Sequence, residues 1–278
     1  KADSVSSPLF PHGAPHGDEI FDISIPAQIN LQFNISFLDH RYSTLIVSPD
    51  GTVAFENNKE VAYDESKKYF GGVRIPSSDV PFIAPLLYKG YRPQNIAPSD
   101  YQGTISYRVV DTRGSASPAS QEDLQLIQDL NLYLPTTVVN APENFDLKFL
   151  IVITWENVAE GPEIFGQKEC RKTQPCNSTT FQLALAGNDS YTFAIFNYGN
   201  YNISVKPNYE AGINAGKGRG WYNVLPCHGS EGCTAINPAA DISNLSNIQG
   251  SDLFGRYIFS VGQEAVIRGG CLSKELVQ

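Results

Sequence analysis

The chain has no methionine, only four histidines and two tryptophans among its 278 residues. The histidines lack the H-E-x-x-H spacing of a zinc-binding helix, and no G-x-S-x-G nucleophile elbow is present. The glycine-rich run at 215–220 lacks the Ser or Thr that follows the lysine of a phosphate-binding loop. These absences exclude the common catalytic motifs. We therefore predict no catalytic residue, no metal ligands and no enzymatic activity.

Long apolar runs and clusters of basic residues are also scarce. The longest largely apolar run, 149–155, is far shorter than the roughly 18–20 residues that cross a bilayer, so we predict no membrane insertion by this region. The net charge is −9, and phosphate binding needs clustered lysine and arginine, so no nucleic-acid partner is predicted. The absence of methionine and of a signal peptide predicts a processed piece of a longer protein.

What the chain does contain is a series of short alternating segments. Apolar residues alternate within 149–155, 181–185 and 191–195, which is typical of strands with one buried face. Gly187-Asn188-Asp189 lies between the last two segments and tolerates positive φ, so it predicts a tight hairpin.

One helix and many short strands complete the expected fold. The helix is predicted to begin after Ser120, which forms a capping box with Asp123, and to stop at Pro135. We expect residues 57–80 to be irregular and residues 206–250 to be largely loop. Further strands are predicted at about 20–25, 29–37, 44–48, 52–56, 103–110, 201–205 and 255–261. The fold class is mainly β: an antiparallel β-sandwich-like domain with one or two short helices and long loops.

Cysteines point to an oxidising compartment. Cys170 and Cys176 bracket five residues, as do Cys227 and Cys233, and we predict a local disulfide in each pair. Each small ring would stabilise the fold by on the order of 2–3 kcal/mol. Cys271 remains, either unpaired or joined to a neighbouring module. Zinc is the alternative for the four paired cysteines, although the C-x5-C spacing differs from the usual C-x2-C.

Glycosylation motifs point to the same compartment. Alternation turns Asn34 and Asn202 outward, whereas Asn188 lies on the predicted hairpin turn and Asn177 in the loop beside Cys176. Chance occurrence is the alternative for any single motif. The predicted N-glycosylation sites are Asn34, Asn177, Asn188, Asn202 and Asn244.

The sequence indicates binding residues less clearly than it indicates cysteine pairs and glycosylation sites. Trp221 and Tyr222 follow a glycine-rich run, and we predict them as a surface anchor because aromatic side chains are favoured at interface hot spots. Other aromatic candidates are Tyr88, Tyr91, Tyr198 and Tyr201, each of which could equally belong to the core. No cofactor is required, but acidic residues in 17–22 and 241–252 leave calcium open as a ligand.

Eight segments, in order, resemble the nidogen-like (NIDO) domain of extracellular matrix and adhesion proteins. The resemblance covers roughly residues 9–262, and its most diagnostic element is VITWENV at 152–158. The other segments are LFPHGAPHGDEIFD, YSTLIVSPDGTVAF, PFIAPLL, GTISYRVV, FQLALAGNDSYTFAIFNYG, AGINAG and SNIQGSDLFGRYIF.

The resemblance implies a non-enzymatic module that acts in cell adhesion or matrix interaction through contacts with extracellular or cell-surface proteins. It implies an extracellular location, in a secreted matrix protein or the ectodomain of a membrane-anchored one, with further modules in the same chain. The expected organisation is an extended N-terminal segment (1–19), one nidogen-like domain (20–264) and a C-terminal tail leading to a following module (265–278). The alternatives are a structural spacer or self-assembly module and a glycan-binding β-sandwich.

Overall fold

The computed structural model describes fifteen segments of the chain. They are residues 7–21, 26–56, 63–68, 74–76, 80–88, 100, 102–114, 119–137, 145–159, 171–173, 175–202, 210–216, 221–223, 242–251 and 253–269. Predictions that fall on other residues, among them Cys170, Cys227, Cys233, Cys271 and Tyr91, lie outside the described residues.

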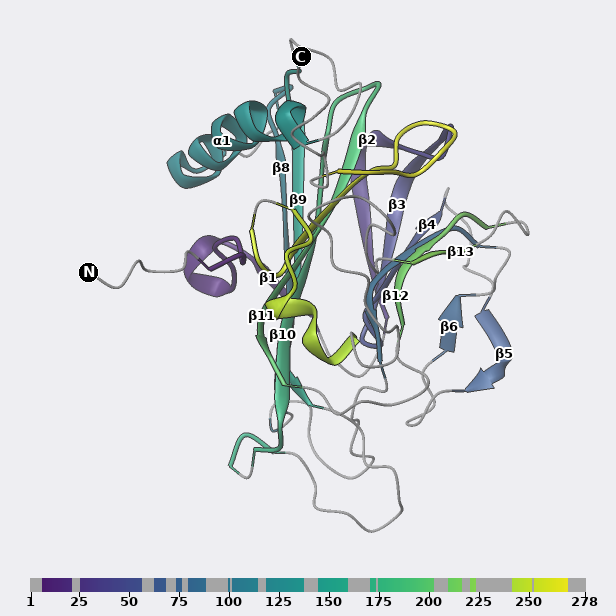
Figure 1. Ribbon diagram of the computed structural model, residues 1–278, viewed down its shortest axis with the longest axis vertical. Helices are drawn as coiled ribbons and strands as arrows, with labels where there is room; N and C mark the ends of the chain where they lie inside the picture. Colours follow the sequence, from purple (N-terminus) through teal and green to yellow (C-terminus); the bar gives the residue numbers. More distant parts are fainter. Residues whose placement is uncertain are drawn as a thin grey trace.

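Most of the described residues form antiparallel strands (Figure 1). A seven-stranded sheet has the order β1-β8-β9-β10-β11-β14-β15, and a six-stranded sheet has the order β13-β12-β7-β4-β3-β2. The strands of the seven-stranded sheet are β1 (Glu19–Phe21), β8 (Thr104–Asp111), β9 (Phe149–Ala159), β10 (Ser178–Gly187), β11 (Thr192–Tyr201), β14 (Arg256–Ser260) and β15 (Ile267–Arg268). Those of the six-stranded sheet are β2 (Ala27–Phe37), β3 (His40–Ser48), β4 (Thr52–Glu56), β7 (Phe82–Leu87), β12 (Glu210–Asn214) and β13 (Trp221–Asn223).

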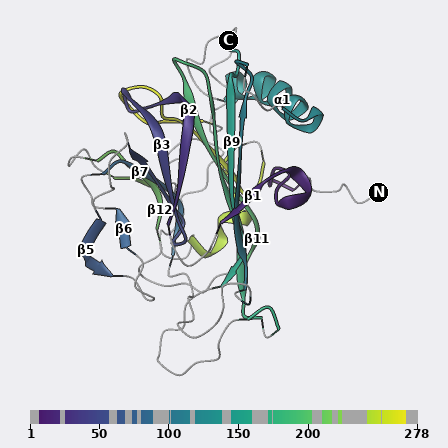
Figure 2. The same cartoon turned by 180° about the vertical axis from the view of Figure 1, so that it is seen from behind.

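The two large sheets pack face to face, which confirms the predicted mainly β, sandwich-like fold. A small sheet of β5 (Tyr63–Lys68) and β6 (Arg74–Pro76) lies beside the six-stranded sheet. Figures 1 and 2 show helix α1 (Gln121–Thr137) and the short helix η1 (Ala14–His16) on the outer side of the seven-stranded sheet. A second short helix, η3 (Ile242–Asn247), packs against the end of β11, where the Tyr201 hydroxyl donates to the Ile242 carbonyl.

The core between the sheets is built from the residues whose alternation was read from the sequence. Trp155 on β9 stacks on Phe181 on β10, with ring centroids 5.0 Å apart, and its Nε1 donates to the Ser48 carbonyl on the opposite sheet. On the six-stranded sheet, Phe37 stacks on Phe55 at 4.0 Å. Aromatic burial of this size is a main stabilising term of a sandwich.

Two hairpins form, and that between β10 and β11 was predicted from Gly187-Asn188-Asp189, although none of these three residues has positive φ. Gly187 ends β10, and the Asn188 amide donates to the Tyr191 carbonyl to close the β10–β11 turn. In the β3–β4 turn, Gly51 has φ +81°, and a Cβ there would lie 1.8 Å from the Leu86 carbonyl oxygen. Only glycine therefore fits this turn against β7.

The expectation of half-buried strands is wrong for β9 and β10. Leu150 and Val152 face away from the inter-sheet core, yet both are fully buried beneath α1. The outer face of the seven-stranded sheet is therefore a second core, which includes Ile127, Leu130 and Leu134 of the helix. Alternation alone did not reveal it, because apolar residues occupy both faces of these strands.

Helix α1 begins as predicted but ends later. The Asp123 amide donates to Ser120 Oγ at 3.1 Å, which is the expected cap. The helix continues past Pro135 to Thr137, because a proline in the last turn removes only one backbone donor. Thr136 and Thr137 donate their hydroxyls to carbonyls three residues back, which satisfies acceptors at the helix end.

Two loop predictions and one strand prediction are corrected. Residues 57–80 are not wholly irregular, since they contain β5 and β6. Residues 206–250 contain β12, β13 and η3; the alternating Ala211 and Ile213 of β12 are buried in the inter-sheet core. Tyr201 is the last residue of β11 and does not begin a new strand.

The seven-stranded sheet is extended by residues near both chain ends. Ile267–Arg268 pairs with β14, so the sheet continues past residue 264. The N-terminal residues lie over a row of buried polar side chains that crosses the outer face of the sheet from strand to strand in register. We call these five residues the polar row: Ser106, Thr154, Gln182, Asn197 and Arg256.

Candidate binding surface

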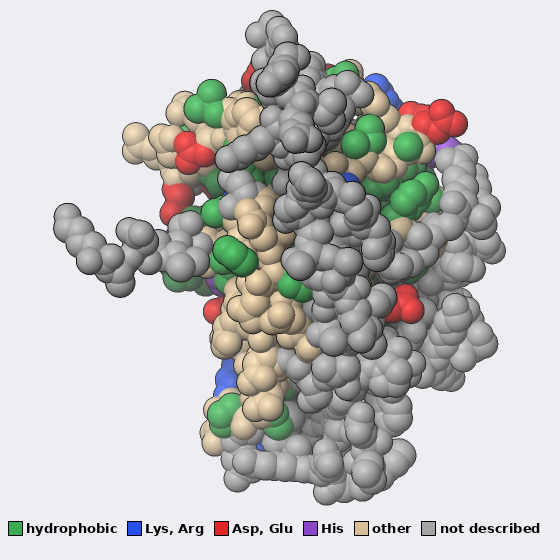
Figure 3. Space-filling model, in the orientation of Figure 1, with side chains coloured by type: hydrophobic (Ala, Val, Ile, Leu, Met, Phe, Trp, Pro, Cys, Tyr) green, Lys and Arg blue, Asp and Glu red, His purple; other side chains and the backbone are tan. Residues whose placement is uncertain are grey.

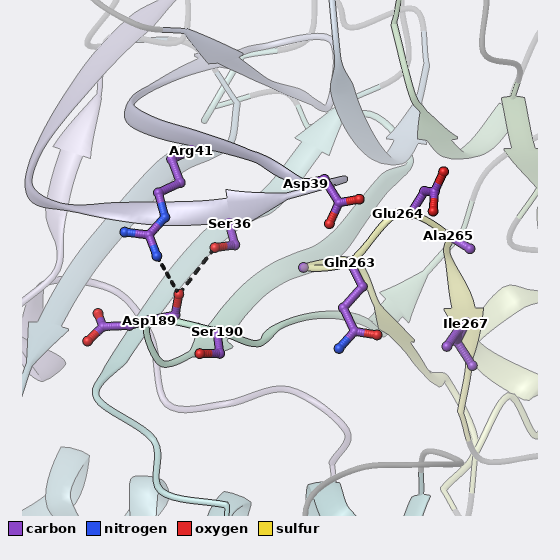
Figure 4. A pocket seen from close by; sticks show the side chains of 10 residues that line it. Ser36, Asp39, Arg41, Asp189, Ser190, Gln263, Glu264, Ala265 and Ile267 are labelled. Atoms are coloured by element: carbon purple, nitrogen blue, oxygen red, sulfur yellow. Dashed lines mark hydrogen bonds between the residues drawn. The ribbon is translucent and has the colours of Figure 1, made fainter.

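A groove of about 650 Å³ opens at one end of the sandwich, where loops from both sheets meet (Figure 4). Its walls are the β2–β3 turn, the β10–β11 turn and the segment that follows β14. The lining residues are Ser36, Asp39, Arg41, Asp189, Ser190, Gly262, Gln263, Glu264, Ala265 and Ile267.

Leu38 anchors the β2–β3 turn to the segment that follows β14. Leu38 and Asp39 both have positive φ, 48° and 63°, which is uncommon for residues other than glycine. The Leu38 side chain is only 3% exposed, and its amide donates to the Val261 carbonyl at 2.7 Å. Burial of Leu38 thus holds the tight turn and presents Asp39 at the rim of the groove.

Two hairpins from different sheets are joined at the Asp189 main chain. Ser36 Oγ and Arg41 Nη2 donate to the Asp189 carbonyl at 3.4 and 3.3 Å, as the dashed lines in Figure 4 show. Arg113 adds an ion pair to Asp189 Oδ1 at 2.9 Å, and its guanidinium lies 4.2 Å from the centre of the Phe33 ring. The groove wall is therefore built from side chains that hold one another in place.

The electrostatic character of the groove is acidic. Its lining contains three carboxylates, Asp39, Asp189 and Glu264, against one guanidinium, Arg41. Asp39 and Glu264 are exposed and form no ion pair with any side chain in the described segments. Figure 3 shows acidic side chains at the upper right, over the β2–β3 turn. Such a surface favours a cationic group on a partner.

The sequence did not single out Asp39, Arg41 or Glu264. The one local signal was the interruption of alternation between 29–37 and 44–48, which marks a turn without saying what it faces. The predicted anchor lies elsewhere: Trp221 and Tyr222 are on β13, the edge strand opposite to β2. Tyr222 is 39% exposed, and the partner role of this pair stays a prediction.

Two other aromatic candidates belong to the core. Tyr88 and Tyr198 are 2% and 1% exposed. The Tyr198 hydroxyl donates to the Pro85 carbonyl across the sheets, and burial raises the pKa of Tyr198 well above its usual value. These two rings are therefore unavailable to a partner.

The predicted glycosylation sites are mostly at the surface. Asn34, Asn177, Asn202 and Asn244 are exposed. Asn188 is half-buried and shapes its turn: Oδ1 accepts from the Ser190 and Tyr191 amides, and Nδ2 donates to the Asp146 carbonyl. Exposure is compatible with glycan attachment, which stays a prediction at all five sites.

Cys176 is disulfide-bonded, and its partner lies outside the described residues. Gln102 holds the main chain of Cys176 from both sides, accepting from its amide at 2.6 Å and donating to its carbonyl at 2.9 Å. The pairing with Cys170 and the second predicted disulfide stay predictions.

The contacts of Asp18 bear on whether calcium could bind. Asp18, in the first acidic group considered for calcium, accepts from Arg108 through Oδ1 and from Gly13 and Ser106 through Oδ2. Its oxygens are thus already engaged by protein donors. In the described segments no three His, Cys, Asp or Glu side chains are placed to hold a metal ion. Asp22, Asp241 and Asp252 lie outside the described residues, and calcium binding stays a prediction.

A two-sheet antiparallel sandwich with a loop-built groove at one end defines a β-sandwich module. The chain belongs to the nidogen-like domain family, whose members it matches over residues 43–263. No helix among the described residues is long and apolar enough to cross a membrane.

Several large proteins contain a similar region. Nidogen-2 of Mus musculus is 27% identical over 195 residues, which cover 68% of this chain and 12% of that protein. Alpha-tectorin of Mus musculus is 27% identical over 238 residues (81% and 9%), and nidogen-1 of Mus musculus is 26% identical over 286 residues (94% and 19%). The chain thus spans less than a fifth of the length of each relative. No solved structure matches it.

Proposed function

We propose that this chain is a non-enzymatic module of an extracellular protein, either a secreted matrix protein or an ectodomain, that acts through contacts with other proteins. The observation that carries the proposal is membership of the nidogen-like domain family together with similarity to nidogens and a tectorin. The predicted glycans and disulfides agree with an extracellular location.

The groove at the sandwich end is the contact surface that we propose. Its rim is formed by loops on a rigid two-sheet scaffold, which is where binding residues are commonly found. Asp39 and Glu264 face solvent without an ion-pair partner in the described chain, so a lysine or arginine of the partner would complete the site. Such contacts contribute mainly to specificity and to the rate of association.

The test is a charge reversal at the groove. The chain, expressed in a secreting eukaryotic cell, is immobilised and probed with a soluble basement-membrane extract at low and at physiological salt. We expect Asp39→Lys with Glu264→Lys to lower the association rate by roughly tenfold, because electrostatic steering is reversed. The effect should shrink as salt is raised.

The matched control is Asp129→Lys with Glu210→Lys, two exposed carboxylates that do not line the groove. It changes the net charge by the same amount and should leave association within about twofold if the groove is the contact surface. Equal losses in both variants would show a nonspecific charge effect and overturn the placement of the contact surface. A failure of the unaltered chain to bind the extract would count against the proposed function itself.

A further inference from the structure

The outer face of the seven-stranded sheet holds the N-terminal segment through its main chain. Gln182 on β10 accepts from the Phe10 amide at 2.9 Å and donates to the Phe10 carbonyl at 3.0 Å. On one side Arg256 donates to the Pro8 carbonyl, and on the other Arg108 donates to the Pro11 carbonyl at 2.6 Å. Four backbone groups of residues 8–11 are thus bound by three side chains from three strands.

The polar row is oriented by its own hydrogen bonds. Arg256 Nε donates to Asn197 Oδ1 at 2.8 Å, and Asn197 Nδ2 donates to Gln182 Oε1 at 3.3 Å. Gln182 Nε2 in turn donates to Thr154 Oγ1 at 3.0 Å. Strand register places these four residues directly opposite one another, so bonds within the sheet orient them, whereas the fifth member of the row, Ser106, donates to Asp18 of the segment.

Two side chains of the segment fit local features of the sheet. Phe10 is buried in the outer core, and the Arg256 guanidinium lies 4.7 Å from the centre of its ring. Leu9 lies over Gly199 of β11, where an added Cβ would stand 2.3 Å from Leu9 Cδ1. The absence of a side chain at Gly199 makes the room that Leu9 occupies.

The segment is fixed at its far end by a buried ion pair. Asp18 Oδ1 lies 2.7 Å from Arg108 Nη1, while Asp18 Oδ2 accepts from the Gly13 amide and Ser106 Oγ. The same arginine contacts Asp123 of α1 at 2.8 Å. Beyond Asp18, strand β1 pairs with β8.

We propose that this face is a binding site for a peptide segment, that residues 7–21 are its ligand, and that it accepts this segment in trans as well as in cis. A second copy of the chain can then supply the segment, which would join two modules non-covalently. Recognition is mostly of the main chain, and hydrogen bonds within the sheet already orient Gln182 and Arg256, so much of the ordering cost falls on the peptide. An empty site would leave buried donors and acceptors unpaired, which disfavours it.

The experiment uses the full chain with a protease site placed between Phe21 and Pro26. The protein is folded, cleaved and passed over a gel-filtration column, and a fluorescent peptide of residues 7–21 is then added. We expect the cleaved segment to co-elute with the body and to exchange with the labelled peptide. Fluorescence anisotropy gives the affinity.

Peptide variants test the contacts one at a time. N-methylation of the Phe10 amide removes the donor to Gln182 and should weaken binding by roughly tenfold or more, because a buried acceptor loses a partner. Gly199→Ala in the body should also weaken binding of the unaltered peptide. A Leu9→Ala peptide should restore binding to that variant, since it removes the atoms that clash.

Three results would overturn the proposal. The cleaved segment could fail to exchange with added peptide, the body could unfold when the segment leaves, or the N-methylated peptide could bind as well as its parent. Rescue of Gly199→Ala by the Leu9→Ala peptide separates site-specific binding from nonspecific adhesion, because only a peptide seated over β11 senses the altered residue. This result is independent of the groove at the sandwich end.

Discussion

The two faces of the seven-stranded sheet differ in the interactions that stabilise their side chains. On the inner face, Trp155, Phe181 and their neighbours bury apolar rings against the second sheet. On the outer face, part of the surface is apolar under α1, and the polar row lies under residues 8–11. Apolar burial is nondirectional, whereas each buried polar atom needs a particular partner at a particular distance.

The inner face should therefore tolerate apolar substitutions that conserve volume, whereas the outer face should not tolerate loss of a hydrogen-bond partner. Volume-conserving apolar substitutions usually cost less than about 1.5 kcal/mol. Leaving a buried donor or acceptor unpaired costs roughly 1–3 kcal/mol for each group.

Trp155→Ala should cause the largest loss of stability, about 4 kcal/mol, because it removes a fully buried ring and leaves a cavity. Urea denaturation measures the change. Trp155→Phe keeps an aromatic ring against Phe181 but loses the hydrogen bond to the Ser48 carbonyl, so its cost should be less than half as large. Equal costs for the two variants would contradict the role assigned to ring packing.

Arg108→Met should lower the free energy of unfolding by about 3 kcal/mol, since the carboxylates of Asp18 and Asp123 are left buried without their cation. The combined variant Arg108→Met, Asp18→Asn, Asp123→Asn should recover part of the loss. If it is less stable than the single variant, charge burial is not the cause.

Gln182→Leu and Leu183→Met compare adjacent residues on opposite faces. We expect a loss of about 2 kcal/mol for Gln182→Leu, because the Phe10 amide and carbonyl lose their partner. Leu183→Met on the inner face should cost less than about 1.5 kcal/mol. Thermal unfolding of the two variants side by side measures the difference, and a reversed order would refute the contrast between the faces.

Ser120→Ala should cost about 1 kcal/mol through loss of the helix cap. Ser120→Asp keeps an acceptor at the cap position but places a second carboxylate beside Asp123, so it should be no more stable than Ser120→Ala. Circular dichroism during urea unfolding gives both values. A fully stable Ser120→Ala variant would mean that Arg108 alone positions Asp123.

The smallest effect concerns Tyr107, whose hydroxyl donates to Glu19 Oε2 at 2.6 Å. Burial and the neighbouring carboxylate raise the pKa of Tyr107 to about 12 from 10.0. The folded state therefore holds this proton more tightly than the unfolded state, and stability declines as pH rises from about 10 to 12. Difference absorbance between the unaltered chain and Tyr107→Phe should show ionisation near 12, and Glu19→Gln should lower that value.

Much of the inner face could be predicted from the sequence, and little of the outer face could. The alternation in 149–155 and 181–185 is a local signal that identifies strands and the residues facing the core. Gln182 and Phe10 are 172 positions apart, and no local pattern connects them. A polar residue within an apolar strand indicates only that a partner is required.

The groove could not be predicted from the sequence for a similar reason. Asp39, Asp189 and Glu264 come from three turns far apart in the chain, and only the packing of both sheets brings them together. The helix cap at Ser120 could be predicted because Ser120 and Asp123 are only three positions apart in the chain. The choice of aspartate at position 123, where glutamate is more usual, is explained by its ion pair with Arg108.

Amide hydrogen exchange at Phe10 tests most directly whether the N-terminal segment is an integral part of the outer face. The Phe10 amide is buried and donates to Gln182, so its exchange should be slowed by orders of magnitude relative to an exposed amide, but less than in β10 and β11, because the segment can leave while the body stays folded. Exchange at the rate of an unstructured chain end, with β10 and β11 still protected, would contradict the account.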